Sequence, residues 1–297
     1  MKCPLCDERT FSEWGKINAF TIMRCVKCGV GITSPFPTAE TLAASNTSIY
    51  TVDQRVMAYL SRRKYFEKRY AGYVKQIKAF KASGRLLDIG CNIGLFLHVA
   101  QQQGFDVEGV ELNKACAEYG NSNLNIAIHT DYLGSIGFQD ESFDVVTMFD
   151  VLEHIPDLHG VMKEVQRILK KDGLLVVQSP NIDSLMSRLT KAKWNWLTPP
   201  DHVYHFTPAT LSSCIERHGF EIRMLKTWEP FEDFLSNIVT AGIGTGIIGR
   251  GLAKLITMFW FIFVPFRFIQ RRWWNKQQGG LIEIYASKDA RTESSGG

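Results

Sequence analysis

The sequence predicts an α/β protein in which strands alternate with helices, preceded by a small cysteine-rich module. Three observations carry this prediction: two close cysteine pairs near the N-terminus, a glycine turn between an apolar run and a helix-like pattern, and repeated strand-like and helix-like segments after that turn. At 297 residues with 45% hydrophobic content, the chain can bury one sizeable core with additions. A formal charge of +4 is too small to indicate a nucleic-acid-binding protein.

The N-terminal segment 1–40 contains two Cys-x-x-Cys pairs, Cys3 with Cys6 and Cys25 with Cys28, separated by 18 residues. This spacing is typical of a four-thiolate zinc site. Four thiolates fill a tetrahedral shell and leave no position for water, so we expect the Zn2+ to be structural. Few basic residues lie between the pairs, which disfavours nucleic-acid binding by this module.

We expect no secretion signal, because the first cysteine pair follows Met1 closely where a signal peptide would have a long apolar core. The seven cysteines are an odd number, which argues against a disulfide framework. We therefore expect a cytoplasmic protein. A proline-rich linker and a helix over 53–80, rich in Tyr, Lys and Arg, occupy the segment 41–82.

The glycine turn lies in "GRLLDIGCNIGLFLHVAQQQG", residues 84–104. A short buried strand stops at this turn, which contains Gly90 and Gly94, and a helical pattern starts directly after it. Glycine lets backbone approach a bound group, and amides at a helix N-terminus suit a polar or anionic ligand. The turn lacks the Gly-Lys-Ser/Thr of a P-loop and the full Gly-x-Gly-x-x-Gly of dinucleotide enzymes.

A second strand, in "FDVEGVELN", ends at Glu111. An acid at this place can bind two ribose hydroxyls, which NAD enzymes and nucleoside-cofactor enzymes both require, so these features alone leave both classes open. Further strand motifs follow in "LNIAIHTDYLG", "FDVVTMFDVLEHIPD" and "LKKDGLLVVQSPN", the last predicted as a helix end, a turn at Gly173 and a fifth strand.

In this order and spacing, the motifs resemble those of the class I S-adenosylmethionine-dependent methyltransferases, particularly the branch with the ubiquinone-biosynthesis O-methyltransferases. The resemblance covers residues 86–221 and resumes at 281–287. It implies a Rossmann-like, seven-stranded, mostly parallel sheet with helices on both faces and an antiparallel last strand. S-adenosyl-L-methionine would lie across the carboxyl ends of the strands.

The resemblance also implies the cofactor-binding residues. Asp88, Gly90, Cys91 and Gly94 would line the methionine part of the cofactor. Glu111 and Leu112 would bind the ribose. Asp131 and Tyr132 would contact the adenine, with Phe149 packed beside it. Cys91, Asn92 and Ile93 stand where small residues are commoner in the family, which would change the shape of the pocket but keeps both glycines.

A methyl acceptor with a hydroxyl group needs a general base. The candidates are His154, directly after the fourth strand, and His202 and His205 in "PPDHVYHFTP", because a similar His-x-x-His-Phe segment borders the acceptor in the resembling branch. The structural alternative for His154 is that it caps a turn. For His202 and His205, the alternative is that one contacts the substrate while the other hydrogen-bonds to backbone groups. A catalytic metal is disfavoured, since only Asp201 is a nearby further ligand.

An insert over 229–280 separates the sixth strand from the seventh. Its uncharged stretches, 234–249 and 255–266, are too short to span a bilayer, and cations alternating with tryptophans follow them. Such a pattern favours contact with a membrane surface through 234–276, which would make the protein peripheral to the inner face of a membrane. The alternative is a buried helical pair or a dimer interface.

The expected organisation is therefore a zinc ribbon over 1–40, a linker and helix over 41–82, a methyltransferase core over 83–228, the insert over 229–280, and a last strand with tail over 281–297. The expected acceptor is a small or lipid-linked molecule, methylated at a hydroxyl. Three alternatives stay open. They are a sugar C-methyltransferase, which the ribbon alone resembles, an NAD-dependent oxidoreductase, and a non-catalytic zinc-ribbon adaptor.

Overall fold

A computed structural model of the chain describes residues 1–38, 40–42, 52–240, 272 and 274–288. The chain divides into two compact units. The unit that we call the ribbon unit consists of Met1–Pro37, Ser179–Ser213 and Leu225–Glu283. The other, the sheet unit, consists of Thr38–Gln178, Cys214–Met224 and Ile284–Gly297.

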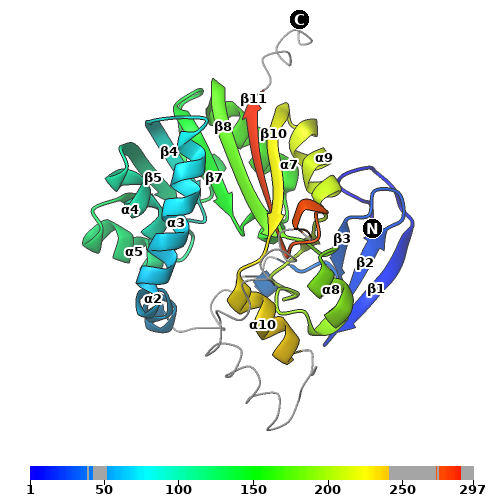
Figure 1. Cartoon of the computed structure of the whole chain (residues 1–297). Helices are drawn as coiled ribbons and strands as arrows, with labels where there is room; N and C mark the ends of the chain where they lie inside the picture. The colour runs from blue at the N-terminus through cyan, green and yellow to red at the C-terminus, as the bar shows by residue number, and fades with distance from the viewer. Residues whose placement is uncertain (39, 43–51, 241–271, 273, 289–297) are drawn as a thin grey trace, which may run out of the picture. The chain divides into compact units, whose positions relative to one another are not determined.

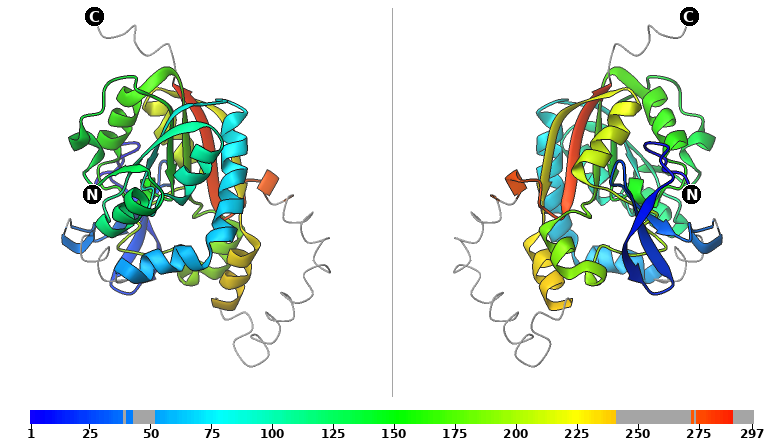
Figure 2. Two further views of the ribbon diagram at one scale, coloured as in Figure 1. Left: turned by 90° about the vertical axis from the view of Figure 1, so that its left-hand side faces the viewer. Right: turned by 90° about the vertical axis from the view of Figure 1, so that its right-hand side faces the viewer.

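The ribbon unit contains a four-stranded antiparallel sheet. Its strands, in spatial order, are β1 (Phe11–Ile17), β2 (Phe20–Cys25), β3 (Gly31–Ser34) and β9 (Tyr204–His205). The β1–β2 hairpin, dark blue in Figure 2, reverses at Asn18, whose φ of 53° is one that asparagine tolerates better than most residues. A segment far along the chain thus completes the sheet of the cysteine module.

A shared hydrophobic cluster joins this sheet to the rest of the ribbon unit. The unit's helical segments are α8 (Leu185–Thr190), η2 (Lys191–Lys193) and α10 (Phe231–Thr240). Buried side chains from β2, from the stretch after β8 and from α10 form the cluster: Ile22, Ile182, Met186, Trp194, Leu197 and Phe234. A cysteine module this small has little apolar core of its own, so these later segments supply most of its packing.

The second sheet has seven strands in the order β10-β11-β8-β7-β4-β5-β6. In chain order they are β4 (Gly84–Ile89), β5 (Phe105–Val110), β6 (Ala127–His129), β7 (Phe143–Phe149), β8 (Leu169–Pro180), β10 (Phe220–Trp228) and β11 (Leu281–Lys288). Strand β4 pairs in parallel with β5 and β7, and the outer pairs β5–β6 and β7–β8 are parallel as well. This is the predicted Rossmann-like, mostly parallel sheet.

Helical segments precede β4 and, along the chain, separate the later strands of this sheet (Figure 1). They are α2 (Val52–Ser61), α3 (Arg63–Lys78), α4 (Leu95–Gln102), α5 (Lys114–Asn123), α6 (Leu133–Ile136), η1 (Leu152–His154), α7 (Leu158–Ile168) and α9 (Pro208–Arg217). The four central strands β4, β5, β7 and β8 bury most of their side chains, as expected for a parallel sheet covered on both faces.

Two sequence predictions need correction. The single helix expected over 53–80 is two helices, because Arg62 leaves helical geometry at φ −113° and ψ 17°. Its guanidinium lies over the rings of Tyr65 and Phe66, at 4.7 and 5.5 Å from their centroids. The helix end and turn expected before the fifth strand are instead part of β8, where the register with β7 shifts around Gly173.

The insert is described only at its two ends. Residues 241–271, which hold most of the predicted apolar stretches, lie outside the described residues. Helix α10 begins the insert, and residues 274–280 lead back to β11. Within the described part of the chain, no helix is both long and apolar enough to cross a membrane.

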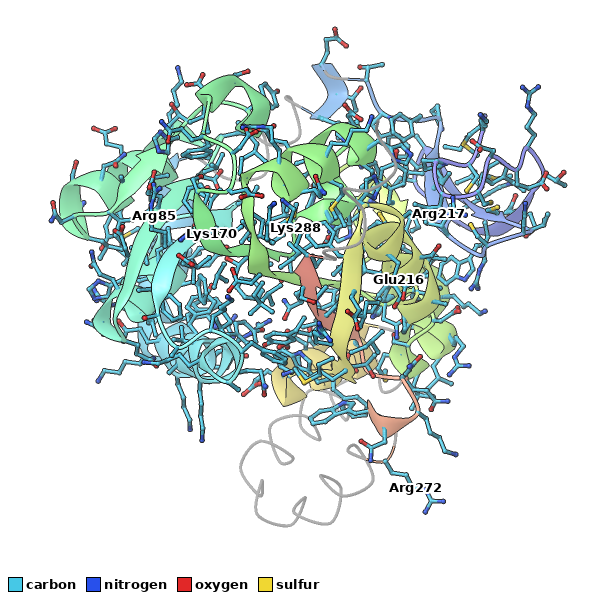
Figure 3. All side chains as sticks on the ribbon, turned by 90° about the horizontal axis from the view of Figure 1, so that it is seen from above. Arg85, Lys170, Glu216, Arg217, Arg272 and Lys288 are labelled. Carbon is cyan, nitrogen blue, oxygen red and sulfur yellow. The ribbon has the colours of Figure 1, made fainter. Side chains whose placement is uncertain are left out.

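Charged side chains at the amino edge of the parallel sheet are paired with one another. Lys170 Nζ lies 2.8 Å from Asp144 Oδ2, Arg85 pairs with Glu108, and Lys288 Nζ lies 3.7 Å from Glu141 Oε1; Lys170, Arg85 and Lys288 are labelled in Figure 3. In an open α/β sheet, ligands bind at the opposite edge, where the strands end. The carboxyl edge is therefore the place to look for a site.

Candidate cofactor-binding and metal-binding sites

The glycine turn between β4 and α4 is built from left-handed backbone. Gly90, Asn92 and Gly94 have φ values of 74°, 52° and 79°. A Cβ on Gly90 would lie 2.4 Å from Val151 Cγ2, so only glycine fits between β4 and the end of β7. The amides of Gly90 and Cys91 both donate to the carbonyl of Val110, at 2.7 and 3.1 Å. These bonds fix the turn to the end of β5.

Glu111 lies directly after β5, facing this turn. Its Oε2 accepts a bond from the amide of Asn92 at 2.9 Å, and its Oε1 accepts one from the amide of Asn113 at 2.8 Å. An ionised carboxylate has about four acceptor positions, so both oxygens can still accept bonds from hydroxyl groups. The carboxylate is thus held in place, with capacity left for a ligand.

Beyond Glu111, large side chains at the carboxyl edge are uncovered. Tyr132 is 74% exposed and Leu112 is 49% exposed. Asp131, also exposed, precedes Tyr132 after the end of β6. An aromatic ligand ring between such side chains would remove apolar surface from water and leave a carboxylate at its edge.

Asp88 is the last polar residue of β4 and is buried, with 3% of its surface exposed. Its Oδ1 accepts a bond of 2.6 Å from the Thr147 hydroxyl. Burial raises the pKa of Asp88 to about 8, with the charge of Glu111 adding to the effect and the Thr147 hydrogen bond opposing it. A cationic group bound nearby would favour the ionised carboxylate.

Phe149 ends β7 between two helices. Its ring stacks on Tyr73 of α3, with centroids 4.8 Å apart and planes at 17°, and meets Phe96 of α4 edge-on at 4.9 Å. Phe96 in turn contacts Tyr70, at 5.7 Å between centroids. The edge of the sheet next to the turn is therefore aromatic, built from α3 as well as from the predicted strand end.

A chain of hydrogen bonds at this edge was not predicted. Arg69 Nε donates to the Tyr73 hydroxyl at 2.8 Å, which donates to Gln178 Oε1 at 2.7 Å, and Gln178 Nε2 donates to both oxygens of Asp150 at 3.0 and 2.9 Å. Burial alone would lower the pKa of Arg69, yet the charges of Tyr73 and Asp150 raise it. Asp150 itself has φ 57°, an uncommon conformation that clusters at functional sites. Arg69 and Tyr73 are four apart on one helix face, which is the one sequence signal from which part of this network could have been found.

The three candidate histidines lie in different units. His154 ends η1 of the sheet unit, where its amide donates to the carbonyl of Val151 at 2.9 Å. His202 and His205 belong to the ribbon unit, with ring centroids 6.3 Å apart. Burial lowers the pKa of His205 to about 3, so its imidazole is neutral at physiological pH.

The four N-terminal cysteines come together as predicted from their spacing. The Sγ atoms of Cys3 and Cys28 are 3.5 Å apart, as are those of Cys6 and Cys25, and all four lie within 4.8 Å of one another. In a tetrahedral zinc site with Zn–S bonds of about 2.3 Å, sulfur atoms lie about 3.8 Å apart. The arrangement fits one zinc ion without rearrangement of the strands.

Comparison with known proteins agrees with this geometry. The family described as "Methyltransferase domain" matches residues 60–225, more than half of the chain. The chain belongs to this methyltransferase family. Among methyltransferase relatives, the ubiquinone biosynthesis O-methyltransferase of Pasteurella multocida is 26% identical over 187 residues, which are 52% of this chain and 77% of the relative. That of Glaesserella parasuis is 32% identical over 107 residues, which are 33% of this chain and only 45% of the relative's length.

Solved methyltransferases share the fold. A protein from Archaeoglobus fulgidus described as an S-adenosylmethionine-dependent methyltransferase has a TM-score of 0.52 at 23% identity, covering 78% of this chain and 99% of that one. A methyltransferase structure from Thermotoga maritima has a TM-score of 0.51 at 17% identity, and the match covers 79% of this chain and 94% of that one. The prediction of an S-adenosylmethionine-dependent methyltransferase is confirmed at the level of the family, against the NAD-dependent alternative.

Proposed function

We propose that the protein transfers a methyl group from S-adenosyl-L-methionine to a hydroxyl group of a small or lipid-linked acceptor. The observation that carries the proposal is the set of groups at one edge of the sheet: the glycine turn, a carboxylate held for ribose at Glu111, and the uncovered side chains of Leu112 and Tyr132. In the proposal, these groups receive the polar, charged and aromatic parts of the cofactor.

Within this site, each residue has a proposed role. Asp88, Gly90, Cys91 and Gly94 would face the methionine part, and Glu111 the ribose. Asp131, Tyr132 and Leu112 would surround the adenine, with Phe149 packing beside it. Arg69 is a cation held at the same edge, so its guanidinium is suited to the carboxylate of the cofactor's amino-acid part.

The sulfonium methyl is already electrophilic, so the protein mainly has to align the acceptor and exclude water. Deprotonation of a hydroxyl needs a base with a pKa near the working pH. The low pKa of His205 makes it a poor proton acceptor, which favours His154 and His202 in that role. His205 is better suited to accept a hydrogen bond that orients the acceptor.

The acceptor class rests on the relatives' names. Both sequence relatives named above are ubiquinone biosynthesis O-methyltransferases, and a sterol 4-C-methyltransferase of Caenorhabditis elegans is 36% identical over 98 residues, covering 31% of this chain and 29% of the relative. The first name refers to O-methylation in ubiquinone biosynthesis and the second to C-methylation of a sterol. They support a hydrophobic acceptor here, while methylation at carbon is the second candidate.

The proposal includes a structural Zn2+ held by Cys3, Cys6, Cys25 and Cys28. The mutual distances of the four sulfur atoms support it. With four protein thiolates around it, the metal would supply folding free energy to the cysteine module and no position for a substrate.

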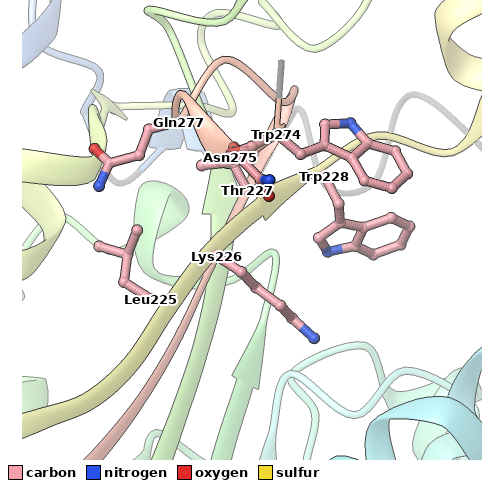
Figure 4. A pocket seen from close by; sticks show the side chains of 7 residues that line it. All are labelled: Leu225, Lys226, Thr227, Trp228, Trp274, Asn275 and Gln277. Carbon is pink, nitrogen blue, oxygen red and sulfur yellow. The ribbon is translucent and has the colours of Figure 1, made fainter. Parts of the chain in front are cut away.

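The proposal also includes contact with a membrane surface through the insert. A pocket of about 590 Å³ lies between the end of β10 and the returning end of the insert, lined by Leu225, Lys226, Thr227, Trp228, Trp274, Asn275 and Gln277 (Figure 4). Indoles and cations are enriched where proteins meet lipid headgroups, and the exposed Arg272 and Lys276 lie next to Trp274 in the sequence.

Isothermal titration calorimetry tests the central proposal. The protein is titrated with S-adenosylhomocysteine, the demethylated cofactor, and separately with NAD. We expect binding of the thioether compound and none of NAD. Binding of NAD alone would refute the proposal. Mass spectrometry of a lipid extract after incubation with methyl-labelled cofactor would then identify the acceptor.

A further inference from the structure

The cysteine module and the histidine segment are parts of one sheet. Strand β3, the last strand of the module, pairs with β9 so that Gly31 lies opposite His205 and Ile32 opposite Tyr204. The amide of Thr33 donates to the carbonyl of Val203 at 3.0 Å. The backbone position of the His202–His205 segment is therefore set by β3.

The two strands approach each other closely at a glycine. A Cβ on Gly31 would lie 2.9 Å from His205 Cβ and 3.3 Å from Ile22 Cγ2. Any larger residue would push β9 away from β3. The close approach brings the side chain of Thr33, two residues along β3, to the histidines.

Thr33 bonds to both histidines from a fully buried position. Its Oγ1 donates to the carbonyl oxygen of His202 at 2.6 Å and lies 3.0 Å from His205 Nε2. A hydroxyl has a single proton, so the bond to His205 must be donated by the ring nitrogen. His205 is thereby held as the Nε2–H tautomer, and Nδ1 carries the lone pair.

The cysteines lie next to β3. Cys25 ends β2, and its amide donates to the carbonyl of Val30 at 2.9 Å, directly before β3 begins. Arg24 Nε donates to the carbonyl of Gly29 at 3.0 Å, in the same turn. A metal that draws Cys25 and Cys28 together would therefore fix the start of β3.

We propose that the cysteine module is a positioning element for the acceptor side of the enzyme. Bound metal fixes β3, and Thr33 on β3 holds the His202 carbonyl and the Nε2–H tautomer of His205, so that His205 Nδ1 is presented as a hydrogen-bond acceptor. Thr33 is a positioning residue, since it acts through the histidines. The inference rests on the proposed function, because a held tautomer matters only if these histidines meet the acceptor.

Histidine-selective 15N NMR of the full chain tests the proposal directly, since the ring nitrogens report the tautomer. We expect His205 to show the Nε2–H form between pH 6 and 8, the same form in Thr33→Ser, and a changed signal in Thr33→Val. Thr21→Val, on the neighbouring strand β2, is the matched control and should leave the signal unchanged. An Nδ1–H tautomer in the unmodified protein, or an unchanged signal in Thr33→Val, would overturn the proposal.

Metal removal gives a second, independent measurement. After extraction of zinc by a chelator, the His205 signal should shift, while the dissociation constant of S-adenosylhomocysteine stays within about twofold, because the cofactor residues belong to the other unit. A His205 signal that is indifferent to metal loss would contradict the inference even if Thr33→Val fails to fold. If the unmodified protein shows the expected His205 tautomer but does not bind S-adenosylhomocysteine, the result would instead contradict the proposed methyltransferase function.

Discussion

Arg24 and Asp183 form a two-point ion pair across a sequence separation of 159 residues, with Nη1–Oδ1 and Nη2–Oδ2 distances of 2.9 and 2.7 Å. The pair joins the cysteine module to the segment after β8. A planar guanidinium can hold both carboxylate oxygens and the Gly29 carbonyl at once, and a lysine ammonium cannot reproduce this geometry.

Arg24→Lys should therefore lower stability although the charge is kept. Both side chains are about one-third exposed, so solvent screening limits the loss to about 1 kcal/mol. The midpoint of thermal unfolding measured by circular dichroism should fall by a few degrees. Lys16→Ala removes the exposed pair with Glu13 at 3.5 Å and should change nothing measurable. If Arg24→Lys and the unmodified protein have equal unfolding midpoints, the two-point ion pair with Asp183 does not contribute to stability.

Glu111→Ala should weaken cofactor binding at least tenfold, because each lost hydrogen bond to a charged group costs about 1.5 to 3 kcal/mol. The change also releases the amides of Asn92 and Asn113, which loosens the glycine turn. Calorimetric titration with S-adenosylhomocysteine measures the effect. Glu118→Ala, an exposed glutamate on α5, is the matched control. If both variants bind like the unmodified protein, Glu111 is not the ribose ligand.

Asp88 should make the ligand-free protein less stable as pH rises. Its pKa is about 8 in the folded state against 3.8 as a free side chain, so the folded protein retains a proton that the unfolded chain has released. Stability from this group is complete below about pH 4 and is lost as pH increases toward 8. Asp88→Asn has no such proton and keeps an acceptor for Thr147.

Thermal unfolding at pH 5, 6, 7 and 8 checks this dependence. The midpoint for Asp88→Asn should exceed that of the unmodified protein at pH 8, by an amount that shrinks toward pH 5. Asp106→Asn, at an exposed position near the start of β5, serves as the control and should follow the unmodified protein at each pH. If the unfolding midpoints of Asp88→Asn and of the unmodified protein change with pH in parallel from pH 5 to 8, the Asp88 carboxyl group is already ionised at pH 5 in the folded state.

The succession of strands and the glycine turn after β4 could be predicted from sequence, because the signals there are local. The residues of a glycine turn after an apolar run are enough to set the backbone geometry of the turn. An acidic residue at a strand end can be located without knowing any distant contact. The same holds for the cysteine pairs, whose spacing sets two knuckles. These predictions depend on a few neighbouring residues, and the corresponding elements appear at the expected positions.

Contacts between distant segments were beyond this kind of inference. Nothing near Thr33 indicates that it meets His205, because β9 is two residues long and its pairing depends on the whole ribbon unit. The network from Arg69 to Asp150 likewise joins α3, β8 and the end of β7. The break at Arg62 was missed because arginine is a good helix former, and aromatic packing overrides that preference.

The protein should contain one zinc ion per chain, held by the four N-terminal cysteines. Cys3→Ser or Cys28→Ser removes one thiolate, and the cysteine module should then lose its fold, since it depends on metal for stability. Elemental analysis of the purified protein measures the metal, and limited proteolysis reports unfolding of 1–37. Cys214→Ser, a buried cysteine outside the cluster, is the control for zinc content. Protein purified without zinc, yet resistant to proteolysis in this segment, would contradict the prediction.

Binding to anionic vesicles should depend on the cations beside Trp274. Arg272 and Lys276 are exposed, and each cation near an anionic surface contributes about 1 kcal/mol, so Arg272→Glu with Lys276→Glu should weaken binding at least tenfold. Trp274→Ala should weaken it further at high salt, where screening leaves the indole contribution in place.

Co-sedimentation with vesicles of phosphatidylcholine, with and without phosphatidylglycerol, measures both effects. Lys163→Glu with Arg217→Glu is the matched control, since it makes the same change in net charge at exposed positions of α7 and α9. Equal loss in both double variants would mean that net charge alone drives the association. If the intact protein sediments with neither kind of vesicle, the proposed membrane contact is wrong. The pocket between Trp228 and Trp274 would then bind another segment of the protein or a second copy of it.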